Sequence, residues 1–196
     1  MGIRVKKSLV HWNYFLALES DLAQVSRYIE FVRSNFRTYS IELAHLLLAS
    51  SSEIDVLAKG ICKFLDPVSN PKNIGHYQNI IMRKLPEFAN ETIYVPRFNL
   101  KIKPWSNWMR GETLPWWNSY NAVKHKRNEH FAEANLKNVL SSMGGLLVSV
   151  CYFYKLKFIS ENKPLKADDD VMNLLGAEQG FLQLRDEYYP SYMIWG

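Results

Sequence analysis

Apolar side chains recur at helical spacing through most of the chain. A first amphipathic helix is predicted over residues 20–36, where Ser20 and Asp21 provide a start and apolar residues follow every three or four positions. A second helix is predicted from Ser40, with its apolar residues on a heptad-like stripe, and it ends before Pro67. These two segments predict a pair of packed helices near the N-terminus.

The middle of the chain interrupts this helical pattern. Residues 71–85 predict a shorter helix, which Pro86 closes. Residues 92–103 alternate β-branched, aromatic and charged side chains and predict a small β-hairpin or a pair of edge strands. Four tryptophans near turn residues indicate either a connection anchored on the core or an exposed stacking surface. They are Trp105, Trp108, Trp116 and Trp117.

The last long helix is predicted over residues 131–158 and is apolar over a wide part of its surface. Such a helix packs on more than one side, either in the centre of a bundle or across a dimer interface. Gly144 and Gly145 in its middle indicate a close crossing with another element. The whole pattern predicts a mainly all-α single domain over residues 1–196, a bundle of about five to six helices with an aromatic-rich insertion at 86–114.

Composition narrows the class of protein. The 196 residues are 47% hydrophobic, which is enough for a packed core. Lys and Arg number 24 against 19 Asp and Glu, a mild basic excess that favours anionic partners but is far from that of a histone-like arm. Cys62 and Cys151 lie in apolar helical patterns, which predicts buried thiols in a reducing compartment.

Two features of the apolar runs bear on localisation. The run near the N-terminus is followed by Glu19 and Asp21, where a signal peptide would need small residues. The longest apolar run, residues 143–154, is shorter than the ~20 residues that cross a bilayer. We therefore expect a soluble, cytoplasmic protein without a membrane partner.

Polar and cationic side chains concentrate in the segment that begins at Pro115. Asn121, His125 and Asn128 fall at i, i+4 and i+7 and predict one polar helix face, with Lys124 beside them. A histidine beside cations is held closer to its neutral form, which suits a general base, and cations stabilise phosphate charge. This composition is suited to gripping or cleaving RNA. The alternative is a helix C-terminus whose cations favour the helix dipole.

The same segment suggests a zinc site at first sight. His125 and His130 are five residues apart, so on a continuous helix their side chains diverge by about 140° and cannot converge on one ion. Lys126 and Arg127 between them repel a cation. The sequence also contains neither a phosphate-binding glycine loop nor a dinucleotide fingerprint. We therefore predict neither a metal site nor a cofactor.

Two segments together resemble the HEPN superfamily, in particular its bacterial members. They read FRTYSIELAHLLLASSSEIDVLAKGIC and WWNSYNAVKHKRNEHFAEANLKNVL, and the resemblance covers residues 15–65 and 110–155. HEPN domains are helical bundles, often dimeric. Many are metal-independent endoribonucleases of toxin–antitoxin, abortive-infection or CRISPR-linked defence systems, and others are non-catalytic RNA-binding or interaction modules. The resemblance implies an HEPN-like bundle, a homodimer, RNA as ligand, and an antitoxin or other protein as a further partner.

The resemblance also implies roles for particular residues. The active family motif is an arginine, usually followed by a polar residue, with a histidine after four to six intervening residues. Here Arg127 is followed by Asn128, but only two residues separate Arg127 from His130. The motif is therefore either shortened, with His125 or His130 as the base, or belongs to a non-catalytic branch. Glu53 is the candidate for the acidic residue that often accompanies the family's arginine and histidine.

Two functions from different classes follow from the sequence. The first is an RNA-binding protein or metal-independent endoribonuclease, in which a histidine takes the 2′-hydroxyl proton and cations hold the scissile phosphate. The second is a non-catalytic helical scaffold that dimerises or binds a protein partner. For the first, the predicted catalytic residues are Arg127, His125, His130, Asn128 and Glu53, and the predicted RNA-binding residues are Lys124, Lys126 and Asn121.

Overall fold

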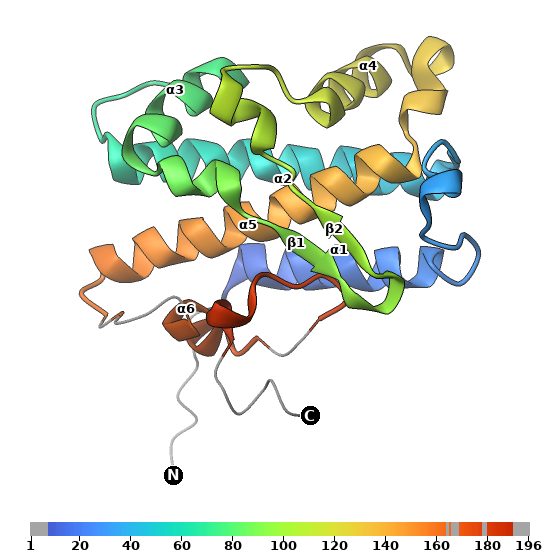
Figure 1. The fold of residues 1–196 in the computed structure, drawn as a ribbon. Coiled ribbons are helices and arrows are strands. Elements are labelled where there is room, and N and C mark those ends of the chain that lie inside the picture. Colours follow the sequence, from blue (N-terminus) through green and yellow to red (C-terminus); the bar gives the residue numbers. More distant parts are fainter. Residues whose placement is uncertain (1–7, 164, 166–168, 178–179, 190–196) are drawn as a thin grey trace.

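Two long helices, α2 (Ile41–Leu65) and α5 (Leu136–Ser160), form the centre of the fold in the computed structural model (Figure 1). They run in the same direction. The Ser50 and Ser142 hydroxyls are 2.8 Å apart, and further along Gly60 lies against the ring of Phe153. Within the chain, the structure describes residues 8–163, 165, 169–177 and 180–189.

Shorter helices and a two-stranded sheet cover this pair, which confirms a mainly α-helical fold with a small hairpin. Tyr94 of the first strand pairs with Lys101 of the second, and the antiparallel turn between them places Asn99 in the left-handed region. On its other side Tyr94 forms a bridge with Gln183 of the C-terminal segment. The covering elements are α1 (Val10–Val25), α3 (Ile74–Lys84), α4 (Pro115–His130), α6 (Asp169–Leu175), β1 (Ile93–Val95) and β2 (Leu100–Ile102).

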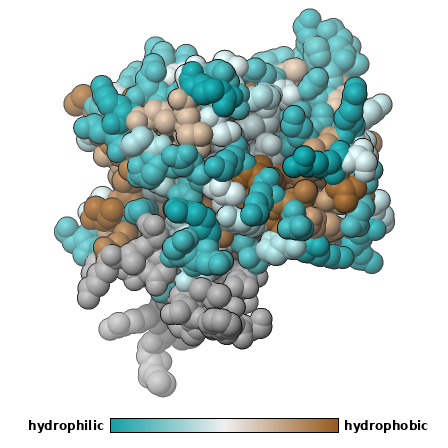
Figure 2. Space-filling model, in the orientation of Figure 1, coloured by the Kyte–Doolittle hydropathy of each residue, from teal (hydrophilic) through white to brown (hydrophobic). Residues whose placement is uncertain are grey.

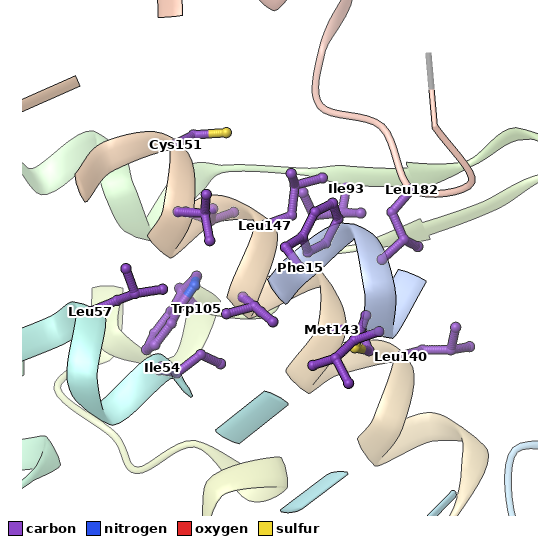
Figure 3. Packing of buried hydrophobic residues seen from close by; sticks show 14 of the residues in the cluster. Phe15, Ile54, Leu57, Ile93, Trp105, Leu140, Met143, Leu147, Cys151 and Leu182 are labelled. Atoms are coloured by element: carbon purple, nitrogen blue, oxygen red, sulfur yellow. The ribbon is translucent and has the colours of Figure 1, made fainter. Parts of the chain in front are cut away.

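One apolar core joins these elements (Figure 3). Phe15 of α1, Ile54 of α2 and Leu147 of α5 are all buried in it. Because the apolar surface of α5 is covered inside the chain, the interpretation of α5 as a helix in the bundle centre is confirmed. By length and hydropathy α5 would also cross a membrane, but 78% of its most apolar window is buried, as in the core helix of a soluble protein.

The aromatic-rich insertion is anchored on this core, as the first of the two alternatives predicts. The indole N–H of Trp116 donates to the carbonyl of Pro104 at 2.9 Å. A side chain at Gly145 would meet the Trp116 ring at 3.4 Å, and one at Gly144 would meet Ile93 at 3.2 Å. The glycine pair therefore permits a close approach by Ile93 and Trp105 of the insertion, by Trp116 of α4 and by Ile54 of α2. Four buried tryptophans fill this region: Trp105, Trp108, Trp116 and Trp117.

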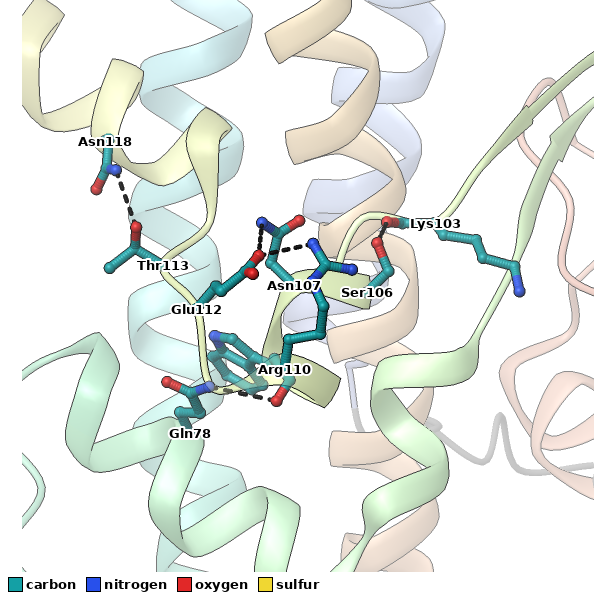
Figure 4. A network of polar contacts seen from close by, with 9 residues as sticks. Gln78, Lys103, Ser106, Asn107, Arg110, Glu112, Thr113 and Asn118 are labelled. Atoms are coloured by element: carbon teal, nitrogen blue, oxygen red, sulfur yellow. Dashed lines mark hydrogen bonds and ion pairs between the residues drawn. The ribbon is translucent and has the colours of Figure 1, made fainter.

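The connection into α4 is held by exposed polar contacts (Figure 4). The carboxylate of Glu112 accepts hydrogen bonds from Arg110 at 2.6 Å and from Asn107 at 3.1 Å. The bond from Arg110 lowers the pKa of Glu112. Gly111 between them has φ +71°, a conformation that favours glycine. These contacts fix the loop from which α4 starts.

The first helix differs from its prediction. It covers Val10–Val25 rather than residues 20–36, and Ser20 and Asp21 lie exposed in its interior. The physical reason is that the apolar side chains before Ser20 continue the same buried stripe, so the helix extends toward the N-terminus. It ends where the Ser26 hydroxyl donates to the carbonyl of Ala23 at 2.7 Å.

Both cysteines are buried free thiols, as the sequence predicts. Burial raises the pKa of Cys62 to about 11 and also raises the pKa of Cys151. Neither thiol is therefore ionised near neutral pH, so both behave as small apolar core residues.

Two buried carboxylates attach the C-terminal segment, residues 180–189, to the rest of the fold. Glu19 of α1 accepts a hydrogen bond from the backbone N–H of Leu182 at 2.7 Å. Burial raises the pKa of Glu19, although backbone hydrogen bonds oppose the shift. Glu91 accepts hydrogen bonds from the hydroxyls of Tyr152 at 2.9 Å and Tyr188 at 2.6 Å. The segment is thus held at two points by buried carboxyl groups that accept hydrogen bonds.

Candidate functional site

The basic segment lies at the C-terminal end of α4. The helix starts at Pro115 and buries Trp116, Tyr120 and Val123, as the sequence spacing predicts. This face packs on α2 and α5, and the end of the helix projects into solvent (Figure 1). Its exposed residues are Lys124, His125, Lys126, Arg127, Asn128 and Glu129.

The helix breaks inside this segment. Lys126 has φ −143° and ψ 58°, far from helical values. Asn128 therefore does not continue the polar face of Asn121 and His125, which the sequence predicted from an unbroken helix. The divergence of about 140° between His125 and His130 likewise holds only for an unbroken helix, so it does not apply across this break. Among the residues that the structure describes, no three His, Cys, Asp or Glu side chains form a metal-binding group.

A buried polar network supports the corner beneath the break. The side-chain amide of Asn138 on α5 donates to the Ser119 hydroxyl and to the backbone carbonyl of Glu133, both at 2.9 Å. Ser119 donates in turn to the Glu133 carboxylate at 2.7 Å. Asn135 caps α5 by accepting from the backbone N–H of Asn138 at 3.1 Å. These hydrogen bonds therefore connect the turn to both α4 and α5.

The cations of the segment differ in their contacts. Lys124 lies 5.3 Å from the ring centroid of Tyr120 and donates to its hydroxyl at 3.2 Å. Lys126 pairs with Glu129 at 3.4 Å, and both side chains are more than half exposed, so this pair contributes little. In the described part of the chain, Arg127 makes neither a hydrogen bond nor an ion pair. Its guanidinium is open to an anionic ligand.

The two histidines predicted as alternative bases occupy the same end of α4. His125 is exposed, and Nε2 of His130 is 4.0 Å from the Glu129 carboxylate. Over the described residues, neither histidine forms a hydrogen bond with Arg127. The candidate base and the candidate phosphate ligand are thus neighbours without a hydrogen bond between them. Such contacts are often long before substrate binds, so the catalytic assignment stays a prediction.

Glu53, the predicted acidic residue, lies elsewhere in the chain. Its carboxylate is 2.5 Å from Nδ1 of His11 on α1, and His11 packs edge-on against Phe153 with ring centroids 4.9 Å apart. Glu53 follows the helix cap Ser40 by 13 positions, which is ~20 Å along α2. Within one chain the structure does not bring Glu53 to the end of α4. Its partner His11 is 42 positions away in sequence, and no local pattern connects the two.

The structure also places an unpredicted segment beside the end of α4. The loop between α1 and α2 crosses the start of α5, where the backbone N–H of Leu136 donates to the carbonyl of Thr38 at 2.9 Å. Tyr39 packs edge-on against Phe131, with ring centroids 5.5 Å apart. Since the contacting residues are about 90 to 100 positions apart, the sequence carries no periodic signal for them.

Comparison of the chain with protein-family models, with curated proteins and with solved structures found no match. The resemblance to HEPN domains therefore remains a prediction from the two sequence segments. A helical bundle by itself is compatible with many functions, so the function of this chain depends on its site residues.

Proposed function

We propose that the chain binds RNA through the exposed end of α4. We call this surface the α4 basic end. The proposal is based on the exposure of its cations and on the hydrogen bonds that hold the adjacent backbone. Three cations within four positions are exposed on backbone that a buried network holds in place. The α4 basic end consists of Lys124, His125, Lys126, Arg127 and Asn128.

The helix dipole explains only part of this arrangement. Cations near a helix C-terminus are favourable within its last turn. Lys124 is in that position, but the break at Lys126 leaves Arg127 beyond the regular helix. Glu129 is the neighbouring carboxylate, and it pairs weakly with Lys126. The positive charge that remains is suited to phosphate groups, for which arginine provides a planar set of donors.

The scaffold alternative has less support. Its strongest surface was the wide apolar face of α5, which is buried inside the chain. The basic end is hydrophilic instead, as Figure 2 shows at the upper right corner where α4 ends. Phosphate contacts fit such a surface better than apolar association does.

Cleavage is the stronger form of the proposal. It assigns Arg127 to the scissile phosphate and either His125 or His130 to the 2′-hydroxyl proton. The HEPN resemblance further implies that two chains bring their basic ends together across a two-fold axis. Binding alone requires neither the dimer nor the base, so the two forms separate experimentally.

Salt-dependent binding tests the proposal. In fluorescence anisotropy with a labelled single-stranded RNA pool, the logarithm of the association constant should fall linearly with the logarithm of the salt concentration between about 50 and 300 mM. The variant Lys124→Ala/Lys126→Ala/Arg127→Ala should bind weakly, with a salt slope reduced by about 0.7 for each phosphate that the protein no longer neutralises. A control with the same charge change, Lys63→Ala/Lys72→Ala/Lys84→Ala, alters exposed cations on α2, α3 and the loop between them. Equally weak binding by both variants would contradict the assignment to α4.

Incubation of the same RNA with EDTA tests cleavage. Products that disappear in Arg127→Ala and in either His125→Ala or His130→Ala would identify a metal-independent nuclease and its base. RNA that is bound but stays intact would assign the chain to the non-catalytic RNA-binding class. Wild type that binds no RNA at low salt would refute the proposed function.

A further inference from the structure

The α4 basic end continues onto the loop between α1 and α2. Besides the bond from Leu136, the backbone N–H of Lys137 donates to the carbonyl of Phe36 at 3.2 Å. Tyr39 forms a β-bridge with Asn135. These backbone contacts hold the loop against the start of α5, directly after the turn that follows α4.

This packing extends the positive surface. Arg33 and Arg37 on the loop and Lys137 on α5 are exposed. In the part of the chain that the structure describes, no carboxylate pairs with any of these three side chains. Together with Lys124, Lys126 and Arg127 they give a band of six cations across one end of the bundle.

Four carboxylates lie on or beside these segments: Glu30, Glu42, Glu129 and Glu133. Glu129 pairs with Lys126, Glu133 accepts the Ser119 hydroxyl, and Glu42 lies 3.8 Å from His45. The six cations therefore outnumber the carboxylates at this end. A polyanion is the ligand that such a band favours.

An aromatic side chain lies within the band. Tyr39 is 51% exposed although its ring packs against Phe131, so the ring is both oriented and accessible. Phe131 follows Arg127 by four residues, which is ~6 Å along a helix. A stacking ring beside phosphate-binding cations is the arrangement with which proteins bind unpaired nucleotides.

We propose that this end of the bundle binds single-stranded RNA, with one base stacked on Tyr39 and the backbone following Arg37 and Lys137 toward the α4 basic end. The inference rests on the proposed function and adds to it the form of the RNA and the path of the strand across the surface. A base must be unpaired to stack on a side chain, so a blunt duplex gains only the phosphate contacts.

The test measures the affinity of the full chain for a single-stranded oligoribonucleotide and for a blunt duplex of the same length. Tyr39→Ala should weaken binding of the single strand by at least about fivefold, and Tyr39→Phe should retain it, because stacking needs the ring and not the hydroxyl. Arg37→Ala should weaken both ligands and reduce the salt slope by about 0.7 for the single strand. Tyr14→Ala and Lys63→Ala are matched controls, since Tyr14 is 42% exposed and Lys63 is an exposed cation at the far end of α2.

The outcomes separate this inference from the proposal on which it rests. Selectively weaker binding by Tyr39→Ala and Arg37→Ala, with unchanged controls, supports a single strand on this path. Wild-type affinity in both variants, combined with weak binding by the Lys124, Lys126 and Arg127 variant, overturns the path and leaves RNA binding at α4 intact. A preference for the duplex overturns the single-strand assignment. Wild type that binds neither ligand overturns both proposals.

Discussion

The α4 basic end and the C-terminal segment use charge in opposite ways. At the C-terminal segment, Glu91 is 2% exposed and has two tyrosine hydroxyls on one oxygen and Arg185 3.5 Å from the other. At the α4 basic end, Arg127 is exposed and makes no ion pair with any residue that the structure describes. The carboxylate of Glu91 therefore contacts three side chains of the same chain, although the oxygen beside Arg185 accepts no hydrogen bond among the described residues. The guanidinium of Arg127 remains available to a ligand.

This difference shows which charges stabilise the fold and which are available to a ligand. Removing a buried carboxylate leaves its hydrogen-bond donors unsatisfied in a medium of low polarity. Removing the donors leaves the carboxylate unsatisfied in the same way. An exposed cation keeps its hydration whether or not a ligand is bound. Substitutions in the two regions should therefore have opposite profiles, with large effects on stability in one and on RNA affinity in the other.

The largest effect on stability is expected for Glu91→Ala. It removes the acceptor for the hydroxyls of Tyr152 and Tyr188 and should lower the free energy of unfolding by about 3–5 kcal/mol. Urea denaturation measures this decrease. Glu87→Ala is the control, because Glu87 is an exposed carboxylate four positions before Glu91. Its free energy of unfolding should stay within about 0.5 kcal/mol of wild type. If Glu91→Ala lowered the free energy of unfolding by less than about 1 kcal/mol, the proposed difference between the Glu91 site and the α4 basic end would be wrong.

A smaller decrease is expected for Asn138→Ala beneath the α4 basic end. The substitution leaves the Ser119 hydroxyl and the Glu133 carbonyl without their donor, so the free energy of unfolding should fall by about 1–3 kcal/mol. RNA affinity should fall as well, because the turn that presents the cations loosens. Asn118→Ala, which removes an exposed hydrogen bond to Thr113, is the control for both measurements. Lower stability with unchanged RNA affinity would show that the network does not position the basic end.

The pH dependence of stability tests the burial of Glu19. Because burial raises its pKa from the ordinary 4.5, the folded chain holds this proton to higher pH than the unfolded chain does. The contribution of Glu19 to stability is complete below pH 4.5 and is lost as the pH rises through the raised value. Glu19→Gln removes this titration. Urea denaturation across about pH 4 to 8 should therefore show the stability of the variant, relative to wild type, increasing with pH and then levelling off. A constant difference would contradict the assignment.

The smallest effects on stability are expected for Lys126→Ala and Arg127→Ala. Each should change the free energy of unfolding by less than about 0.5 kcal/mol, because the side chains are exposed and weakly paired. Thermal and urea denaturation check this expectation. A decrease above about 1 kcal/mol would show that these cations stabilise the fold and would remove the contrast with Glu91.

Local chemistry made several elements predictable from the sequence. Ser40 caps α2 by accepting from the backbone N–H of Leu43 at 3.1 Å, and Pro115 occupies the first turn of α4. The hairpin between β1 and β2 follows from alternation around Pro96. Each of these signals acts between residues a few positions apart, which is the range that a sequence pattern expresses.

The parts that escaped prediction depend on distant partners or lack a local marker. Lys126 breaks α4 without a glycine or proline, and the pairing of Glu53 with His11 joins residues 42 positions apart. For α1, the apolar run before Ser20 forms the first part of the helix, whereas Ser20 and Asp21 resemble a local helix start. The composition of the candidate site was readable from the sequence, but its shape and its extension toward Tyr39 were not.

The bond between Glu19 and Leu182 has a consequence for the order of folding. It joins residues 163 positions apart, so the first helix emerges from the ribosome long before its carboxylate meets its donor. The outer edge of β1 likewise stays unpaired until Gln183 forms its bridge with Tyr94. Until residues 180–189 have been synthesised, the nascent chain has an uncovered strand edge and an unpartnered acid beside apolar surface. We expect the docking of residues 180–189 to be the last folding event, and a chain that stops before residue 180 to be prone to aggregation.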